Sequence, residues 1–363
     1  MGPSRRHGLF IGIGLLLIFI VVEIQSYAFG KLSISNGNSF QFYQSDVFDL
    51  SPEQLANENA AGVLGWQLNV PRPQSSRFSS SCGSAFGDSM THGDEVGDDE
   101  AWLHRLSERL GCDVQNFGVG GYGLDQAALR YELGTPPGDF VILGLFIEML
   151  RRDLAASWTF YRGPAKNNLP SYSVTKPMFV MENDRLELVP RPTQPVTRKA
   201  IVQHHHQDFF LNSLWTQLSF PYSYAAGRAI YRRYVDEGYL NNISSNQFWL
   251  PNHPSHADAL AAKILGRMRD QSSQRRQRLV VVMIPQVEEA DQREPAYAQF
   301  AQDAARQMPD VCIVDTYPAV AAEAAKVGVA ALRAPLGHYS PAGSDVLARA
   351  VREGLQRCGI AGT

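Results

Sequence analysis

The sequence predicts an α/β fold in which a parallel sheet of five strands is covered by helices on both faces. Two observations lead to this prediction. From residue 80 onward, short apolar runs alternate with amphipathic stretches of helical periodicity. The apolar runs are continuous and do not alternate with polar residues, as expected of strands that are buried on both faces of a parallel sheet.

The five expected strands are the apolar runs of this alternating region. They lie at residues 82–86, 114–117, 140–146, 279–284 and 311–315. Three helices are expected between or after them. Residues 98–110 begin with acidic side chains that suit a helix N-terminus, residues 124–133 follow a glycine-rich turn, and residues 340–357 close the chain.

Residues 155–275 break this alternation and are interpreted as an insertion. Prolines recur through its first part, and a β-hairpin is expected with strands at residues 178–181 and 186–189. Helical patterns rich in Phe, Tyr and Trp follow between residues 208 and 239. The insertion therefore adds a hairpin and helices to the sheet domain.

The N-terminus predicts a membrane segment. Residues 8–22 carry no polar side chain, and two arginines precede them, which favours a cytoplasmic N-terminus and an exported body. Ser26 and Ala28 are also the small residues that a signal-peptide cleavage site needs. We expect an uncleaved anchor over residues 8–28 after a cytoplasmic tail at residues 1–7, with a cleaved signal peptide as the alternative.

Composition excludes one class of partner. The chain of 363 residues has a formal net charge of -3 and no basic face, so we expect no nucleic acid partner. Its 44% hydrophobic and 19% charged residues are ordinary for a globular protein. We also expect no cofactor and no metal, because no set of ligating residues has a metal-binding spacing.

The four cysteines suit an oxidising compartment. Cys82 and Cys112 each stand at the start of an expected strand, so two neighbouring parallel strands would bring them to the same edge of the sheet. Cys312 and Cys358 would then form the second pair. Four buried free thiols are the alternative, because sequence does not decide connectivity.

Three segments carry the candidate chemistry. In the first, glycines flank Asp88 and Ser89 directly after the first strand, which lets the chain turn sharply and expose the serine. In the second, closely spaced glycines at residues 118–123 let backbone N–H groups approach a substrate oxygen. In the third, His338 precedes the last helix and suits a general base for Ser89.

These segments resemble the GDSL/SGNH hydrolase superfamily over roughly residues 80–155 and 278–357. The stretches GDSMTHGDEVGDDEAWLHRLSERLG and NFGVGGYGLDQAALRY carry the resemblance, together with the histidine at His338. It implies an SGNH-type three-layer sandwich, so that residues 80–363 form an SGNH hydrolase-like domain with an insertion at about 155–275. Residues 29–79 are an extracytoplasmic lead-in.

The resemblance also implies roles for residues. Ser89 is the nucleophile, His338 is its base, and the N–H groups of Ser89 and Gly121 form an oxyanion hole. We expect Asp88 to brace the turn through backbone hydrogen bonds. The other expected pocket residues are Gly120, His92, Glu148 and Met149.

Two positions depart from the family pattern. The third family motif carries an asparagine that donates to the oxyanion, and here that position holds Glu148 or Met149. The family's aspartate before the histidine is replaced by Pro335 and Leu336. We therefore expect a backbone carbonyl to orient His338, which would make the site a Ser–His dyad.

The chain is similar to single-anchor members that are encoded with bacterial exopolysaccharide machinery. This implies an inner-membrane protein with its catalytic domain in the periplasm or outside. The expected activity is that of a serine esterase or O-acyltransferase acting on acyl esters, acetyl above all, of an extracytoplasmic polysaccharide. The alternative is a catalytically impaired domain that binds polysaccharide or a partner in a synthesis and export complex.

Overall fold

The computed structural model describes residues 3–66, 72, 78–162, 169–236 and 245–360. The chain divides into two compact units, and each is described by itself. The anchor unit consists of Met1–Ala60, Ala155–Thr175 and Pro192–Ile243. The sheet unit consists of Ala61–Leu154, Lys176–Arg191 and Ser244–Thr363.

The sheet unit is built on five parallel strands in the order β3-β2-β4-β8-β9. Their bounds are Ser81–Phe86 (β2), Asp113–Asn116 (β3), Phe140–Phe146 (β4), Arg278–Ile284 (β8) and Cys312–Asp315 (β9). Every residue of the central strand β4 is buried, which explains its uninterrupted apolar sequence. The parallel sheet of five strands that the sequence predicts is thus confirmed.

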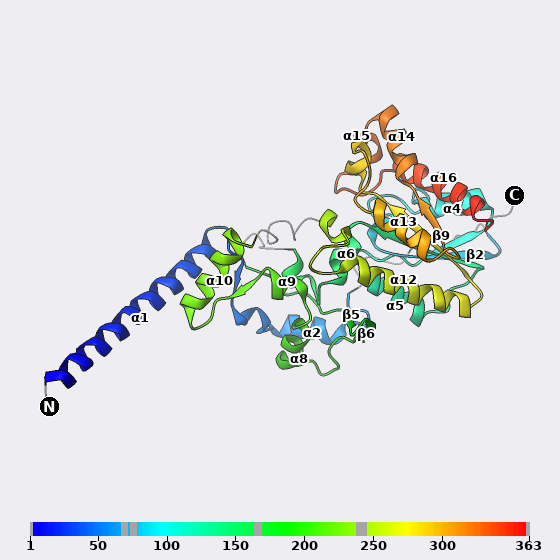
Figure 1. Cartoon of the computed structure of the whole chain (residues 1–363). Helices are drawn as coiled ribbons and strands as arrows, with labels where there is room; N and C mark the ends of the chain where they lie inside the picture. Colours follow the sequence, from blue (N-terminus) through cyan, green and yellow to red (C-terminus); the bar gives the residue numbers. More distant parts are fainter. Residues whose placement is uncertain (1–2, 67–71, 73–77, 163–168, 237–244, 361–363) are drawn as a thin grey trace. The chain divides into compact units, whose positions relative to one another are not determined.

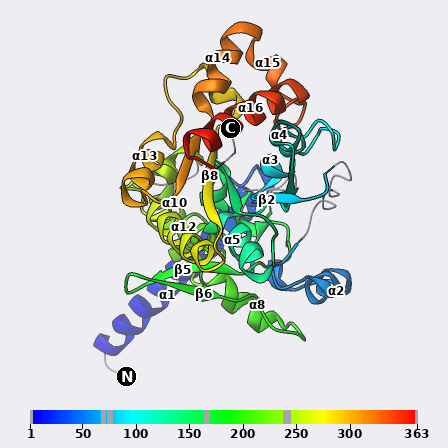
Figure 2. The same cartoon turned by 90° about the vertical axis from the view of Figure 1, so that its right-hand side faces the viewer.

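Helices cover both faces of this sheet and make three layers (Figures 1 and 2). On one face lie α4 (Trp102–Leu110), α14 (Tyr317–Val327) and α16 (Pro341–Arg357), and on the other lie α5 (Leu124–Leu133) and α12 (Ala257–Gln274). The helices α3 (Ser89–His92), α6 (Glu148–Asp153), α13 (Ala298–Gln307) and α15 (Val329–Leu332), with the 3-10 turns η2 (Ser245–Trp249) and η3 (Val287–Asp291), complete the unit.

The expected helices are present, with one start displaced. The helix predicted from residue 98 begins at Trp102, because Gly97 O accepts from the N–H groups of Glu100 and Ala101 and the acidic residues lie in the preceding turn. The predicted hairpin is β5 (Met178–Glu182) paired antiparallel with β6 (Arg185–Val189), and it belongs to the sheet unit.

Both predicted disulfides are present. Cys82 is bonded to Cys112 at one edge of the sheet, and Cys312 in β9 is bonded to Cys358 at the end of α16. The alternative of four free thiols is therefore wrong. Each bond joins a strand of the sheet unit to a segment that is distant in sequence.

The anchor unit is formed mainly by helices. Its elements are α1 (Pro3–Ser35), β1 (Phe42–Tyr43), η1 (Ser45–Phe48), α2 (Pro52–Ala60), α7 (Trp158–Tyr161), α8 (Arg198–His205), α9 (Phe209–Ser213), β7 (Thr216–Gln217) and α10 (Tyr222–Tyr234). The strands β1 and β7 pair in parallel. The helical pattern predicted between residues 208 and 239 forms α9 and α10, and its last three residues lie outside the described ones.

The domain boundaries expected from the sequence differ from these two units. The sequence places residues 155–275 in one insertion, whereas only 155–175 and 192–243 group with the first 60 residues. Residues 244–275 belong to the sheet unit, because α12 packs on α5 and β8 there. The boundaries of a single hydrolase-like domain remain a prediction.

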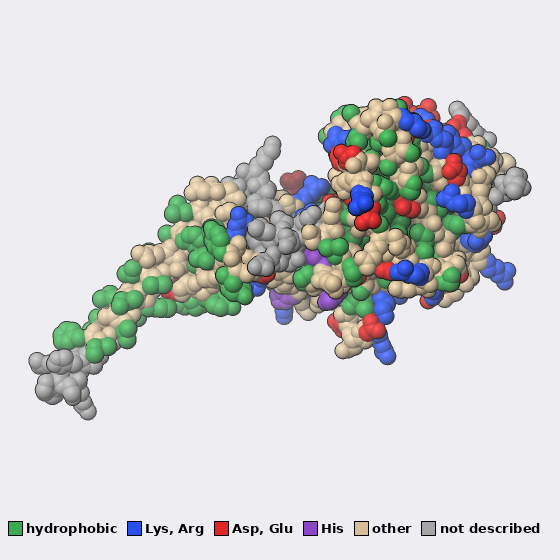
Figure 3. All heavy atoms as spheres, turned by 45° about the horizontal axis from the view of Figure 1, so that its top comes forward, with side chains coloured by type: hydrophobic (Ala, Val, Ile, Leu, Met, Phe, Trp, Pro, Cys, Tyr) green, Lys and Arg blue, Asp and Glu red, His purple; other side chains and the backbone are tan. Residues whose placement is uncertain are grey.

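The long N-terminal helix contains one segment that is long and apolar enough to cross a membrane. This segment is Phe10–Ser35, and an 18-residue stretch of it has a mean hydropathy of 2.1. Figure 3 shows its hydrophobic side chains exposed along the helix. In water, such an apolar surface would need a protein partner to cover it. In a membrane, the lipid acyl chains would cover it.

Candidate active site

The candidate site lies at the point where the strand order of the sheet reverses. From β2 the chain passes to β3 on one side and then returns to β4 on the other side of β2. In open parallel sheets, the connections at such a point leave a crevice outside the carboxyl ends of the two strands. Gly87, Asp88 and Ser89 follow the carboxyl end of β2, and α6 follows that of β4.

Ser89 is the first residue of the short helix α3. Asp88 caps this helix with its side chain, because Oδ1 accepts from the backbone N–H of Met90 at 2.9 Å. Gly93 ends the helix in a left-handed conformation. Only Gly87 and Asp88 separate the strand from the helix, and Ser89 keeps 8% of its surface exposed.

Gly87 makes this sharp turn feasible. It has a φ of 156°, and a Cβ at this position would lie 2.1 Å from Oγ1 of Thr91 and 2.7 Å from the carbonyl oxygen of Gly144 in β4. The second contact involves backbone in the middle of the sheet, which does not shift readily. Only glycine therefore lets β2 enter α3 so close to β4.

Asp88 has a structural position, as expected from the sequence. Besides capping α3, its carboxylate accepts from Nη1 of Arg152 at 2.7 Å, and the same nitrogen donates to the carbonyl oxygen of Tyr122 at 3.1 Å. Burial raises the pKa of Asp88 above its ordinary value, although Arg152 opposes the shift. Asp88 and Arg152 together tie the serine turn to the glycine loop.

The glycine loop lies directly beside α3. The N–H of Val119 donates to the carbonyl oxygen of Gly87 at 3.0 Å. A Cβ on Gly118 would lie 2.5 Å from the backbone nitrogen of His92, so this glycine allows the two segments to touch. Gly121 has a φ of 76°, in the left-handed region that favours glycine.

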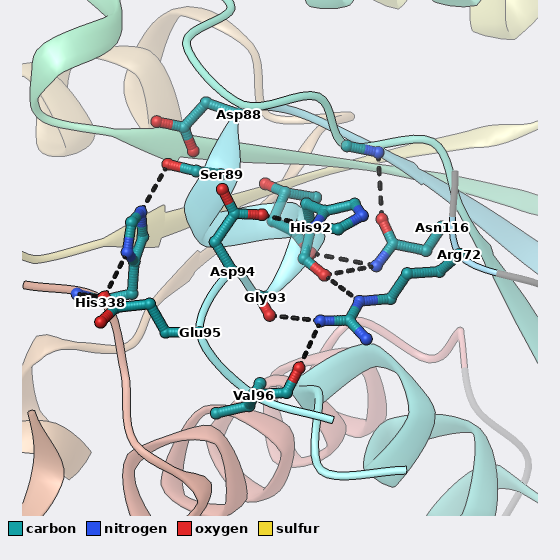
Figure 4. Close-up of polar contacts among 12 residues, drawn as sticks. Arg72, Asp88, Ser89, His92, Gly93, Asp94, Glu95, Val96, Asn116 and His338 are labelled. Atoms are coloured by element: carbon teal, nitrogen blue, oxygen red, sulfur yellow. Dashed lines mark hydrogen bonds and ion pairs between the residues drawn. The ribbon is translucent and has the colours of Figure 1, made fainter. Parts of the chain in front are cut away.

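His338 reaches Ser89 from the other end of the chain (Figure 4). Its Nε2 lies 2.9 Å from Oγ of Ser89. The loop before α16 holds the histidine, because the N–H of Ala334 donates to the carbonyl oxygen of His338 at 2.8 Å. The structure thus brings together the two residues that the sequence named as nucleophile and base.

A third residue completes this arrangement, and it was not expected. Nδ1 of His338 lies 2.6 Å from Oε2 of Glu95, whose carboxylate also accepts from the backbone N–H groups of Leu336 and His338 (Figure 4). The expectation that a backbone carbonyl orients the histidine is therefore wrong. Glu95 comes from the loop after the nucleophile, whereas the family's aspartate stands just before the histidine.

The environment of Glu95 favours its ionised form. Burial alone would raise its pKa, but the N–H groups of Leu336 and His338 and the His338 ring outweigh burial and hold the pKa below its ordinary value. The Glu95 side chain is 12% exposed and that of His338 is 20% exposed. Glu95 also has a φ of 71°, which is uncommon for a residue with a side chain and marks a constrained position.

Arg72 holds the loop that carries Glu95. Its guanidinium donates to the backbone carbonyl oxygens of His92, Gly93 and Val96 (Figure 4). It also forms an ion pair with Asp98. These partners lie on both sides of Glu95 in sequence. A planar group with five donors can bind several carbonyls at once, so this one side chain sets the shape of the loop.

The remaining expected pocket residues have other partners. Met149 is fully buried, and its Sδ accepts from the backbone N–H of Phe146 at 3.4 Å. The carboxylate of Glu148 lies 3.9 Å from Arg151 within α6. Nδ1 of His92 lies 2.5 Å from the carboxylate of Asp94. The involvement of these three residues and of Gly120 in a pocket remains a prediction.

Glu95 escaped the sequence prediction because no spacing rule links it to His338. It stands among other acidic residues, Asp94 and Asp98 to Glu100, which suggested a helix start. The one available signal is an acidic residue six positions after the nucleophile. This signal becomes informative only because Pro335 and Leu336 replace the aspartate that the family carries before the histidine.

Several solved structures are similar to this chain. A member of the lipolytic G-D-S-L family from Veillonella parvula matches 77% of this chain and 100% of its own, with 11% identity and a TM-score of 0.39. An acetyl xylan esterase from Geobacillus stearothermophilus matches 79% of this chain and 99% of its own, with 15% identity and a TM-score of 0.39.

A third similar structure is LAE5, an α/β hydrolase from the metagenome of Lake Arreo in Spain. It matches 80% of this chain and 100% of its own, with 12% identity and a TM-score of 0.40. No protein-family model and no curated protein sequence matches the chain. The three solved structures thus share 11–15% of their aligned residues with this chain, at TM-scores of 0.39–0.40.

Proposed function

We propose that this protein is a membrane-anchored serine esterase or O-acyltransferase of the SGNH type that acts on acyl esters of an extracytoplasmic polysaccharide. One observation carries the proposal: Ser89, His338 and Glu95 form a continuous hydrogen-bonded relay with distances of 2.9 and 2.6 Å. A serine activated by a histidine, itself oriented by a carboxylate, is the arrangement that acyl transfer uses on unrelated folds.

In the first half of the reaction, Oγ of Ser89 attacks the ester carbonyl carbon and its proton passes to Nε2 of His338. The ionised Glu95 fixes the proton on Nδ1, so that Nε2 is free to accept, and it stabilises the imidazolium that forms. The tetrahedral intermediate then collapses. The carbon–oxygen bond to the sugar breaks, and His338 returns the proton to the departing sugar hydroxyl.

In the second half, the acyl group leaves Ser89. Water or another sugar hydroxyl gives a proton to His338 and attacks the acyl carbon, and Ser89 is released with the proton from His338. Water makes the protein an esterase, whereas a sugar hydroxyl makes it an acyltransferase. The same three residues serve both outcomes.

Backbone N–H groups would stabilise the oxyanion. Ser89 is the first residue of α3, so its N–H has no acceptor within that helix and lies at its positive end. The N–H of Gly121 is the second donor, on a loop bonded to the serine turn through Val119. Met149 and Glu148 have no side-chain amide, so the proposed hole has two backbone donors in place of the family's usual three donors.

The contacts of the N-terminal helix support the anchored form over a cleaved signal peptide. Cleavage after Ala28 would remove Glu23, whose carboxylate accepts from the N–H groups of Tyr222 and Ser223 at the start of α10. The helix is thus part of the folded anchor unit. Together with the two disulfides, this supports an inner-membrane protein whose active domain faces the periplasm or the outside.

The proposal is tested with purified full-length protein in detergent and a fluorophosphonate probe that labels activated serines. We expect labelling and aryl-acetate hydrolysis in the wild type, and loss of both in Ser89→Ala and His338→Ala. Ser79→Ala, at an exposed serine before β2, is the matched control and should behave as the wild type. Acetylated polysaccharides then identify the substrate, with an added unacetylated acceptor to separate transfer from hydrolysis.

A folded wild type that takes no label would contradict the esterase proposal. Polysaccharide or partner binding without catalysis would then be the better function. One observation favours this second candidate, namely that Glu148 or Met149 stands where the family's oxyanion-donating asparagine is expected, and neither side chain carries an amide. Equilibrium binding of the Ser89→Ala protein to polysaccharide would measure it directly.

A further inference from the structure

The start of α10 packs against the apolar part of the N-terminal helix, inside the segment that would lie in a membrane. The rings of Phe220 and Phe19 contact edge to face, with centroids 6.2 Å apart. Those of Tyr222 and Tyr27 lie 4.9 Å apart. Phe19 belongs to the run of residues 8–22 that has no polar side chain. A residue that touches Phe19 is therefore at membrane depth whenever α1 crosses a bilayer.

The depth can be estimated from helix geometry. With a rise of about 1.5 Å per residue, the run of residues 8–22 is roughly 22 Å long, short of the hydrocarbon thickness of about 30 Å. A span that starts at residue 8 therefore reaches its far side near Tyr27. Phe19 and Glu23 then lie within the outer leaflet, and so does the turn that contacts them.

Glu23 would be costly there without partners. A carboxylate in hydrocarbon is strongly unfavourable, and such residues pair with protein groups. Here Glu23 is buried and accepts from the backbone N–H groups of Tyr222 and Ser223 and from the Ser223 hydroxyl. The amino end of α10 thus satisfies Glu23 in the place where water would be absent.

The exposed side chains of this region change in character with distance from the apolar run. Phe220 comes first and is 64% exposed, followed by Tyr224, which is 69% exposed. Arg228 is exposed one helical turn further on. This order matches the layers of a membrane. An apolar ring suits the acyl chains, a tyrosine suits the interface, and an arginine suits the lipid phosphates. The sequence of α10 also contains three arginines and no acidic residue.

We propose that Phe220 and the first turn of α10 enter the outer leaflet of the membrane that α1 crosses, with lipid covering the exposed rings of Phe220 and Tyr224. This inference rests on the proposed membrane anchor but not on the proposed catalysis. The anchor unit is then held at two points, a spanning helix and an interfacial turn. A single spanning helix leaves a domain free to rotate, whereas two points of attachment restrict its orientation.

The test uses full-length protein in phosphatidylcholine vesicles that contain nitroxide-labelled acyl chains. All native cysteines are in disulfides, so one introduced cysteine accepts a single NBD fluorophore. The sites are Phe220→Cys and Tyr224→Cys, with Leu16→Cys in α1 as the membrane reference. Lys199→Cys, exposed on α8, is the aqueous reference. The thermal unfolding midpoint of each variant, compared with that of the wild type, reports independently whether the variant is folded.

We expect NBD at position 220 to emit at a shorter wavelength than in water, and we expect the nitroxide lipids to quench most of this emission, as at position 16. At Tyr224 we expect partial loss, and at Lys199 none. Emission at Phe220 and Tyr224 that resists quenching like Lys199, while Leu16 is quenched, would overturn the inference. If Leu16 also resists quenching, the anchor is not in the membrane and the inference falls with it. Neither result affects the esterase proposal, which the Ser89 labelling reports.

Discussion

Oε2 of Glu95 lies 2.6 Å from Nδ1 of His338 across 243 positions of sequence. The same carboxylate accepts the backbone N–H of His338, so it holds both the ring and the main chain of the histidine. Glu95 thereby occupies the place that an aspartate near the histidine fills in the family pattern. This relationship makes several properties of the protein testable.

Replacement of Glu95 by glutamine should lower kcat with little change in KM. The amide keeps the size of the side chain, but it carries no charge to stabilise the imidazolium and can select the wrong ring tautomer. We expect a fall of about 10²- to 10⁴-fold in kcat for aryl acetates. Asp99→Asn, on an exposed acidic residue of the same loop, is the control. An unchanged kcat in Glu95→Gln would show that His338 needs no carboxylate.

Glu95 should also make stability depend on pH. Its pKa is lower in the folded protein than the ordinary 4.5, so its ionised form stabilises the fold at neutral pH. That contribution is lost as the pH falls through the lowered pKa. The thermal unfolding midpoint of wild type should therefore exceed that of Glu95→Gln at neutral pH and converge with it in acid, once the pH lies below the lowered pKa of Glu95. A difference that persists or grows in acid would contradict this assignment.

Arg72 should act through Glu95. Its loss releases the loop from three carbonyl contacts, so Arg72→Ala should reduce kcat by roughly 10- to 100-fold through misplacement of the carboxylate. Lysine lacks the planar fork and should not restore the rate. In the Glu95→Gln background, Arg72→Ala should cost little more, because the two substitutions remove one function. Additive losses would indicate that Arg72 acts independently.

Two glycines should respond to alanine in opposite directions. At Gly118 the new Cβ would meet the backbone of His92 and Asp88, so Gly118→Ala should destabilise by about 1–3 kcal/mol and reduce Ser89 labelling. At Gly266, within α12, no heavy atom of the described residues lies within 4 Å of the Cβ position, apart from the adjoining backbone of the helix itself. Gly266→Ala should stabilise by roughly 0.5–1 kcal/mol. Chemical denaturation measures both, and equal effects would refute the steric argument.

The disulfides should contribute to stability. They close loops with sequence separations of 30 and 46 residues, and losing either should cost about 2–5 kcal/mol. A reductant should lower the unfolding midpoint of the wild type. The same reductant should have no effect on a variant with all four cysteines replaced by serine, which serves as the control. A wild-type midpoint that does not respond to full reduction would contradict a stabilising role.

The function was predicted from three short segments of the sequence. The serine turn, the glycine loop and the position before the last helix each have local requirements, such as the φ of 156° at Gly87. Such requirements restrict residue type strongly, so Ser89, Gly121 and His338 could be named before any coordinates. Glu95 could not, because an acidic residue in a polar loop of the sequence fits many roles.

By itself the sequence determined the parallel sheet, the apolar N-terminal segment and the pairing of Ser89 with His338, whereas it left the cysteine pairing open. These features depend on local backbone geometry and on burial, and both leave a visible pattern in the spacing of apolar residues and glycines. Only the tertiary structure decided that Glu95 faces His338, that Arg72 shapes its loop, and that the start of α10 meets Glu23 inside the apolar segment. These contacts join residues that are distant in sequence. The partner of a carboxylate depends on where the fold places its loop, and a local sequence pattern contains no information on that placement.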